Sequence, residues 1–64
     1  MLLNNTELSA LADHLINVID CSPEYEDDCF AFTFEGVRIY TERYVDAFRC
    51  EIGHEDDVIE LPRH

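Results

Sequence analysis

The sequence predicts a small α+β domain in which an N-terminal helix packs on a small antiparallel sheet. Hydrophobic residues recur every three or four positions between residues 5 and 20, whereas they occupy every second position between residues 29 and 41. The first period is typical of a helix and the second of a strand. Length is the third observation, because a chain of 64 residues buries only about 60% of its unfolded surface and has room for one shallow core. We therefore expect residues 1–64 to form a single domain.

The helix is expected over residues 5–20, where hydrophobic positions form one stripe along its side. The stripe consists of Leu8, Leu11, Ala12, Leu15, Val18 and Ile19. One of the polar residues at positions 4–6 can cap the first turn by accepting a hydrogen bond from a free backbone N–H, and Glu7 suits the positive end of the helix dipole. Pro23 ends the helix because it has no N–H to donate. His14 falls at the edge of the stripe, where an ordinary boundary histidine is expected.

A β-hairpin is expected over residues 29–41. One face of its first strand carries Phe30, Phe32 and Phe34, and the other carries Cys29, Ala31 and Thr33. Glu35-Gly36 forms the tight connection, because glycine readily adopts the positive φ that hairpin turns require. In the return strand, Val37 and Ile39 would join the phenylalanines against the helix. Arg38 and Tyr40 would then face the opposite side, toward solvent or a partner.

The segment 42–52 fits a second helix better than the alternative, a long bent strand. No Gly, Pro, Asn or Asp marks a turn between Tyr40 and Val45, which argues against another hairpin strand. As a helix, the segment gains Thr41 as a cap and Gly53 as the residue after its last turn. Its hydrophobic stripe would be Tyr44, Val45, Phe48 and Ile52.

A short closing strand is expected at residues 57–61, the last regular element of the chain. Its sequence, Asp57-Val58-Ile59-Glu60-Leu61, alternates apolar and acidic side chains, and Pro62 follows it. No internal repeat or low-complexity segment interrupts the chain, so the sequence contains no linker.

Charge is the most unusual property of the sequence. Fifteen Asp and Glu stand against four Arg, with no Lys, and the net charge is −11, yet seven aromatic residues indicate a folded core rather than a disordered acidic tail. Such a charge has consequences for partners rather than for the fold. Direct binding to nucleic acid or to anionic lipid is not expected, because both would repel the chain. Two interpretations remain open: the acidic surface serves solubility, or it binds a basic partner.

Residue types suited to metal binding or catalysis occur without the spacing that either needs. Cys21, Cys29, Cys50 and His54 are zinc-ligand types, but only Cys50 and His54 lie close together in the chain. Those two residues could meet as a nucleophile and its base only if residues 42–54 were wholly helical. The acidic runs lack the calcium-loop pattern and sit in solvent, where carboxylates do not acquire divergent pKa values. We expect no catalytic residue, no metal and no cofactor, and reduced thiols in a cytoplasmic protein.

The residues expected to contact a partner are the acidic clusters and neighbouring tyrosines. They comprise Glu24, Glu26, Asp27 and Asp28 in one loop, Glu42 and Asp46 on the outer face of the second helix, Glu55, Asp56 and Asp57 in another loop, and Tyr25 and Tyr40 as aromatic anchors. Eleven charges match those on roughly 19 Å of duplex DNA, and a compact domain of this length has a radius of gyration of about 11 Å. The charge density is therefore of the order of that of DNA. The sequence does not determine whether the three clusters share a face.

In its length, acidity, lack of lysine, aromatic-rich core and absence of an active-site motif, the chain resembles the small acidic inhibitors encoded by phages, among them DNA-mimic anti-CRISPR proteins. The resemblance implies a non-enzymatic inhibitor that occupies a basic nucleic-acid-binding site in the host cytoplasm, with a CRISPR effector complex such as a type I Cascade as its target. Two other classes fit the same composition: an acidic antitoxin or phage-encoded binder of another host nucleic-acid enzyme, and a housekeeping domain with an incidentally acidic surface. We expect a monomer that binds neither membrane nor nucleic acid directly.

Overall fold

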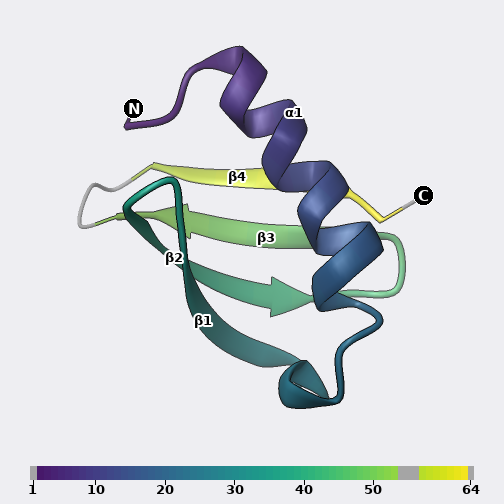
Figure 1. Ribbon diagram of the computed structural model, residues 1–64. Coiled ribbons are helices and arrows are strands. Elements are labelled where there is room, and N and C mark those ends of the chain that lie inside the picture. The colour runs from purple at the N-terminus through teal and green to yellow at the C-terminus, as the bar shows by residue number, and fades with distance from the viewer. Residues whose placement is uncertain (1, 54–56, 64) are drawn as a thin grey trace.

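The fold is a four-stranded antiparallel sheet with one helix packed across one of its faces (Figure 1). The computed structural model describes residues 2–53 and 57–63. The strands are β1 (Cys29–Phe34), β2 (Val37–Arg43), β3 (Ala47–Ile52) and β4 (Val58–Pro62), and they are neighbours in chain order. The expected α+β class, with an N-terminal helix on an antiparallel sheet, is confirmed, as is a closing strand at the expected place. Among the described residues, no helix combines the length and hydrophobicity that a membrane crossing needs.

The helical segment starts with a capping box and changes geometry before it ends. In α1 (Asn5–His14), the Asn4 Oδ1 accepts from the Glu7 N–H at 2.8 Å while the Glu7 Oε1 accepts from the Asn4 N–H at 3.0 Å. The chain continues as a π-helical segment, η1 (Leu15–Ile19), in which the Asp20 N–H donates to the Leu15 carbonyl at 2.8 Å. This wider turn keeps Ile19 buried but leaves Val18 51% exposed. Including Val18 in the core stripe was therefore wrong.

The β1–β2 hairpin has the expected turn and facing. Phe34 pairs with Val37, so Glu35 and Gly36 form a two-residue turn, and both have positive φ angles, 51° and 75°. Positive φ at both central positions is the requirement of a type I′ turn. Ile39 is buried beneath the helix and Tyr40 is exposed on the opposite side, as the alternation predicted.

The predicted second helix over 42–52 is wrong, because this segment completes β2 and forms β3. The Tyr44 N–H donates to the Ala47 carbonyl at 2.9 Å and closes a turn that has no residue with positive φ. The turn contains Asp46, a residue type that favours turns. It lies one position beyond the stretch between Tyr40 and Val45, so the absence of a turn residue in that stretch was misleading. As a strand, the segment buries Phe48, Cys50 and Ile52 completely, whereas Val45, which the helix would have used in its stripe, is 86% exposed.

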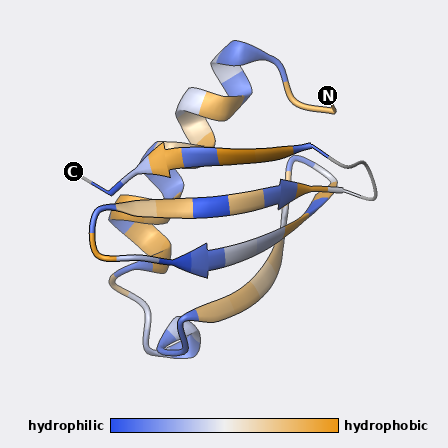
Figure 2. Ribbon diagram, turned by 180° about the vertical axis from the view of Figure 1, so that it is seen from behind, coloured by the Kyte–Doolittle hydropathy of each residue, from blue (hydrophilic) through white to orange (hydrophobic). Residues whose placement is uncertain are grey.

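The core lies between the helix and the inner face of the sheet. It consists of Leu3, Leu11, Leu15, Ile19, Phe32, Ile39, Phe48, Cys50 and Ile52. His14 packs over its edge, with its ring centroid 5.7 Å from that of Phe32 and 5.4 Å from that of Phe34. No described helix covers the opposite, outer face of the sheet (Figure 2). The fold therefore gives the sheet two chemically different faces.

Candidate partner-binding surface

Residues 24–28, here called the acidic loop, connect the helix to β1. The short 3₁₀ turn η2 (Pro23–Tyr25) opens the loop, and the Ser22 Oγ accepts from the Glu24 N–H at 3.4 Å. The side chain of Tyr25 is half-buried, with its ring centroid 5.3 Å from that of Phe30. The four acidic residues of the loop are exposed: Glu24, Glu26, Asp27 and Asp28. The loop is thus anchored through its tyrosine and directs its carboxylates outward.

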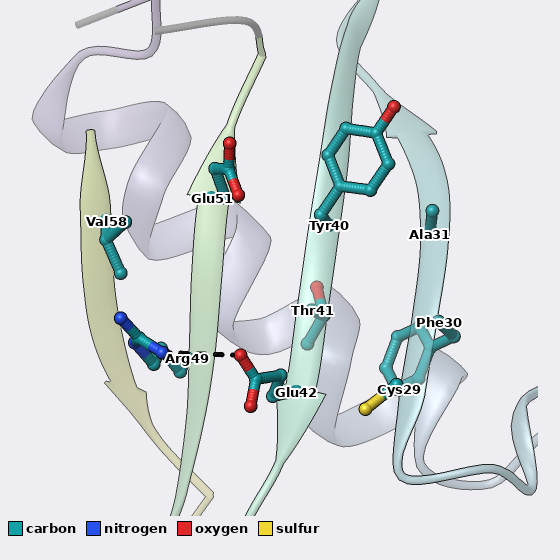
Figure 3. Close-up of a pocket in the computed structure, with 9 residues that line it drawn as sticks. All are labelled: Cys29, Phe30, Ala31, Tyr40, Thr41, Glu42, Arg49, Glu51 and Val58. Carbon is teal, nitrogen blue, oxygen red and sulfur yellow. Dashed lines mark hydrogen bonds and ion pairs between the residues drawn. The ribbon is translucent and has the colours of Figure 1, made fainter. Parts of the chain in front are cut away.

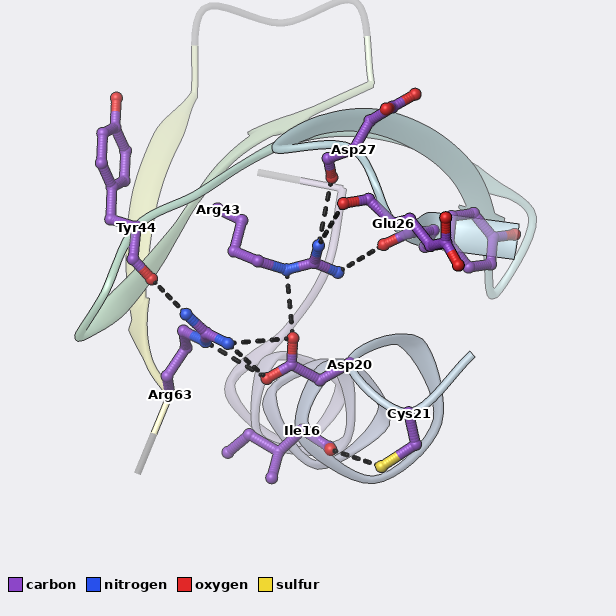
Figure 4. A network of polar contacts seen from close by, with 9 residues as sticks. Ile16, Asp20, Cys21, Glu26, Asp27, Arg43, Tyr44 and Arg63 are labelled. Atoms are coloured by element: carbon purple, nitrogen blue, oxygen red, sulfur yellow. Dashed lines mark hydrogen bonds and ion pairs between the residues drawn. The ribbon is translucent and has the colours of Figure 1, made fainter. Parts of the chain in front are cut away.

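Arg43 fastens the backbone of the acidic loop rather than its carboxylates. Its guanidinium donates to the carbonyl oxygens of Tyr25 at 2.7 Å, Asp27 at 3.1 Å and Glu26 at 3.4 Å (Figure 4). Its backbone N–H donates to the Asp28 carbonyl at 2.6 Å, and its guanidinium carbon lies 5.1 Å from the centroid of the Phe30 ring. One side chain therefore holds three consecutive carbonyls of the loop.

Asp20 joins this arginine to a second one. The Arg43 Nε lies 3.0 Å from Asp20 Oδ1, and the Arg63 Nη2 lies 3.0 Å from Asp20 Oδ2. Arg63 also donates through Nη1 to the Tyr44 carbonyl at 2.7 Å. We call Asp20, Arg43 and Arg63 the arginine clamp, because together they tie the end of the helix, the acidic loop, the end of β2 and the segment after β4 to one another.

The two arginines of the clamp pair with Asp20 and with backbone carbonyls, not with the carboxylates of the acidic loop. The other ion pair between described side chains joins Arg49 to Glu42 at 3.3 Å. The carboxylates of the acidic loop form no ion pair with any residue in 2–53 or 57–63. The clamp carries two positive charges and one negative charge, so it and the loop, with four acids, together retain a net charge of −3.

Sequence reasoning missed the arginine clamp. Because β2 alternates, Arg43 takes the next inward position after Ile39 and Thr41. A charged residue at an inward position of a strand is the signal that could have identified it, since an inward charge needs a partner. Because the sequence pattern of residues 42–52 favoured a helix, the inward position of Arg43 in a strand was not recognised.

Glu42 and Asp46, which the sequence placed together on the face of a helix, lie apart. Glu42 is on the outer face of β2, where its Oε1 lies 3.3 Å from Arg49 Nη1 and its Oε2 accepts from the Tyr44 hydroxyl at 2.8 Å. That hydrogen bond raises the pKa of Tyr44, and the charge of Glu42 adds to the effect. Asp46 lies in the exposed turn between β2 and β3. The grouping was wrong because the helix does not exist.

The acidic loop and Asp57 do not lie together either. The loop precedes β1 and Asp57 precedes β4, and the strand order places these two strands at opposite edges of the sheet. Three interstrand spacings of about 4.8 Å separate them by roughly 14 Å. Glu55 and Asp56 lie outside the described residues. Tyr40 is exposed on the outer face of the sheet, so the two predicted aromatic anchors also occupy different surroundings.

The three cysteines differ in accessibility. Cys21 and Cys29 are exposed, whereas Cys50 is buried in β3, where its sulfur accepts from the Thr41 hydroxyl at 3.7 Å. Burial raises the pKa of the Cys50 thiol. The helix that would have brought Cys50 near His54 is absent, and His54 itself lies outside the described residues. Within 2–53 and 57–63, no three His, Cys, Asp or Glu side chains cluster closely enough to share a metal ion.

Together these features define a small α+β domain whose helix covers one face of a four-stranded meander and whose acidic loop is held by an arginine clamp. Comparisons with protein-family models, with curated proteins and with solved structures found no match. The function is therefore inferred from the chemistry of the chain's own surface.

Proposed function

We propose that this chain is a non-enzymatic inhibitor that uses its acidic loop to occupy a basic nucleic-acid-binding site on a target protein. The observation that carries the proposal is the loop itself. Its four exposed carboxylates have no ion-pair partner among the described residues, while Arg43 holds the carbonyls beneath them. A loop already ordered in the free protein loses less conformational entropy when it binds.

The density of charge supports a nucleic-acid-like mode of binding. The molecule measures 27 × 19 × 19 Å and carries a net charge of −11. A duplex 27 Å long carries about 16 phosphate charges, so the chain reaches roughly two thirds of that density. A channel lined with Lys and Arg would attract such a body over long distances and accelerate its association.

The resemblance to DNA-mimic anti-CRISPR proteins directs the proposal to a first target, a CRISPR effector complex such as a type I Cascade in the host cytoplasm. The inhibitor would compete with DNA for the basic channel of that complex. It would perform no chemistry on its target.

The test is a competition assay that follows affinity capture with the tagged chain. The captured protein or the purified effector complex is mixed with fluorescent duplex DNA, and displacement is measured as the chain is added. We expect the wild-type chain to displace DNA, and we expect the variant E26Q/D27N/D28N to need at least about tenfold more protein, because exposed charge pairs contribute up to about 1 kcal/mol each.

A matched control separates the loop from net charge. The variant D13N/E35Q/E60Q removes the same number of exposed charges elsewhere and should displace DNA nearly as well as the wild type. Equal competition by the loop variant and the wild type would overturn the proposal. Capture of a toxin, or of another nucleic-acid enzyme that the chain inhibits, would replace the effector complex as target while retaining the mode of binding.

A further inference from the structure

The outer face of the sheet is a second surface, distinct from the acidic loop. The helix packs on the opposite face (Figure 2). The outer side chains include Tyr40 and Val58, each 45% exposed. Between them the face forms a depression of about 400 Å³ whose lining also includes Glu42, Arg49 and Glu51 (Figure 3). This face combines apolar area with charges of both signs.

Its charge balance differs from that of the whole molecule. The alternation of β2, β3 and β4 places three acids, Glu42, Glu51 and Glu60, and two arginines, Arg38 and Arg49, on the outer face. Its formal charge is therefore −1, whereas the whole chain carries −11. A second copy of this strongly acidic chain would meet less repulsion here than at the acidic loop.

The strand register makes the outer face complementary to itself. Tyr40 pairs with Glu51 and Glu42 pairs with Arg49 across β2 and β3. If two sheets stack face to face about a two-fold axis parallel to the strands and midway between β2 and β3, β2 of one copy lies over β3 of the other. Glu42 of each copy then faces Arg49 of the other, and the Tyr40 hydroxyl faces Glu51. We propose that a second copy of this chain covers the outer face through this isologous contact.

The outer strands fit the same axis. It places β1 of one copy over β4 of the other, and Ala31 and Val58 belong to the same cross-strand row as Tyr40 and Glu51. The small Ala31 side chain therefore lies opposite the larger Val58. Stacked sheets keep their strands within about 30° of each other, so the central pairs of charges remain in register.

The size of the face sets the strength of the contact. Four strands about 4.8 Å apart and about five residues long cover roughly 300 Å² in projection, less than the roughly 800 Å² that each partner contributes to a standard interface. The dimer is therefore a reversible one that forms at micromolar or higher concentration.

Salt should favour this dimer. The net charges of two copies repel over long distances, and raising the ionic strength from about 0.01 M to about 0.15 M shortens the screening length from about 30 Å to about 8 Å. The contact pairs of Glu42 with Arg49 are short-range and become partly buried, so they are screened less. Dimerisation thus strengthens over a range of salt in which binding of the acidic loop to a basic site weakens.

The test is sedimentation equilibrium of the full chain and of two charge variants. R49E and E42R each place like charges opposite each other across the two-fold axis, so each variant alone should dimerise at least about tenfold more weakly than the wild type. Their mixture restores both contacts, because the two arginines of the E42R copy then face the two glutamates of the R49E copy. We expect the mixture to regain the wild-type dimer affinity.

Three results would overturn the inference: a wild-type chain that stays monomeric at high concentration and moderate salt, an R49E variant that dimerises like the wild type, or a mixture that fails to associate. Circular dichroism of each variant verifies that it is folded. Displacement of DNA by R49E in the competition assay tests the acidic loop separately, so the failure of one proposal is distinguishable from the failure of the other.

Discussion

Glu35 occupies a backbone conformation that its side chain disfavours. Its φ of 51° lies in the left-handed region at the first central position of the type I′ turn between β1 and β2. A residue with a Cβ loses roughly 1–2 kcal/mol in this region, and Asn is among the few types that tolerate it. The sequence Asn-Gly is also the preferred pair for this turn.

We therefore predict that Glu35→Asn raises the free energy of unfolding by about 0.5–1 kcal/mol. Urea denaturation monitored by circular dichroism measures the change. Glu35→Gln is the control, because it removes the same charge without gaining the left-handed tolerance of Asn, and its stability should stay close to that of the wild type. Equal stabilisation by both substitutions would show that charge, rather than backbone strain, is responsible.

Cys50 links stability to alkaline pH. Burial raises the pKa of its thiol above the ordinary value of 9.0, so the folded chain retains this proton at a pH where the unfolded chain has released it. The contribution of this thiol to stability is fully present below pH 9. As pH rises above 9, the free energy of unfolding falls by up to about 1.4 kcal/mol per pH unit because of this group. Denaturation curves between pH 8 and pH 10 measure the slope.

Cys50→Ala provides the control for this slope. The variant should be less stable at every pH, because it leaves a cavity in the core, but its stability should fall less steeply above pH 9. Thiol labelling checks the burial directly: Cys21 and Cys29 are exposed in the folded chain and should react at once, while Cys50 should react at the rate of unfolding. Rapid labelling of all three thiols would contradict the assignment.

At the scale of elements, the acidic loop depends on a residue of β2 for its shape. The side chain of Arg43 is only 12% exposed and donates to three loop carbonyls. Arg43→Met keeps the apolar stem but removes every one of these donors, and leaves Arg63 as the partner of Asp20. The Tyr25 carbonyl would lose its donor at a partly buried position, whereas the exposed Glu26 and Asp27 carbonyls can pair with water instead. We therefore predict a loss of about 1–3 kcal/mol in stability.

Hydrogen exchange distinguishes a local effect of Arg43→Met from a global one. The amides of residues 24–28 should exchange faster than the loss of global stability explains, because the loop opens separately from the sheet. Arg38→Met removes the same charge from an exposed position and should change stability by less than about 0.5 kcal/mol. If both variants behave alike, Arg43 does not hold the loop.

The elements with strong local signals could be predicted from the sequence. The sequence predicts a helix over 5–20, and α1 with η1 covers residues 5–19. The predicted hairpin 29–41 is formed by β1 and β2, with Glu35-Gly36 as the turn between them. The segment 42–52 could not be assigned in this way, because its turn uses residues without positive φ and only pairing with β2 and β4 fixes it as a strand. Exposure of the acidic loop was also predictable, since buried unpaired carboxylates are costly.

The relations between distant residues were beyond the sequence. Asp20 and Arg63 are separated by 43 positions but are joined by an ion pair, and no local period encodes such a contact. For the same reason the sequence did not show that the acidic loop and Asp57 lie beside opposite edge strands. Composition predicted how much charge the surface carries, and only the fold determines where it lies.

At the scale of the whole molecule, two surfaces should respond to salt in opposite directions. The acidic loop and clamp together retain a net charge of −3. Contacts between the loop and a basic channel release counterions, so target binding should weaken steeply as salt rises. The outer face carries a formal charge of −1, and self-association there is opposed mainly by the long-range repulsion that salt removes.

We predict that the logarithm of the target affinity falls with the logarithm of salt concentration more steeply for the wild type than for E26Q/D27N/D28N, because each carboxylate that enters the channel adds to the number of ions released. Titrations between about 0.05 M and about 0.3 M salt measure both slopes, while the Debye length falls from about 14 Å to about 6 Å. D13N/E35Q/E60Q, with the same net charge as the loop variant, should retain the wild-type slope. Equally reduced slopes for the two variants would mean that net charge alone attracts the target, and the arginine clamp would then have no part in presenting it. Parallel slopes for all three proteins would mean that the loop carboxylates do not enter the channel.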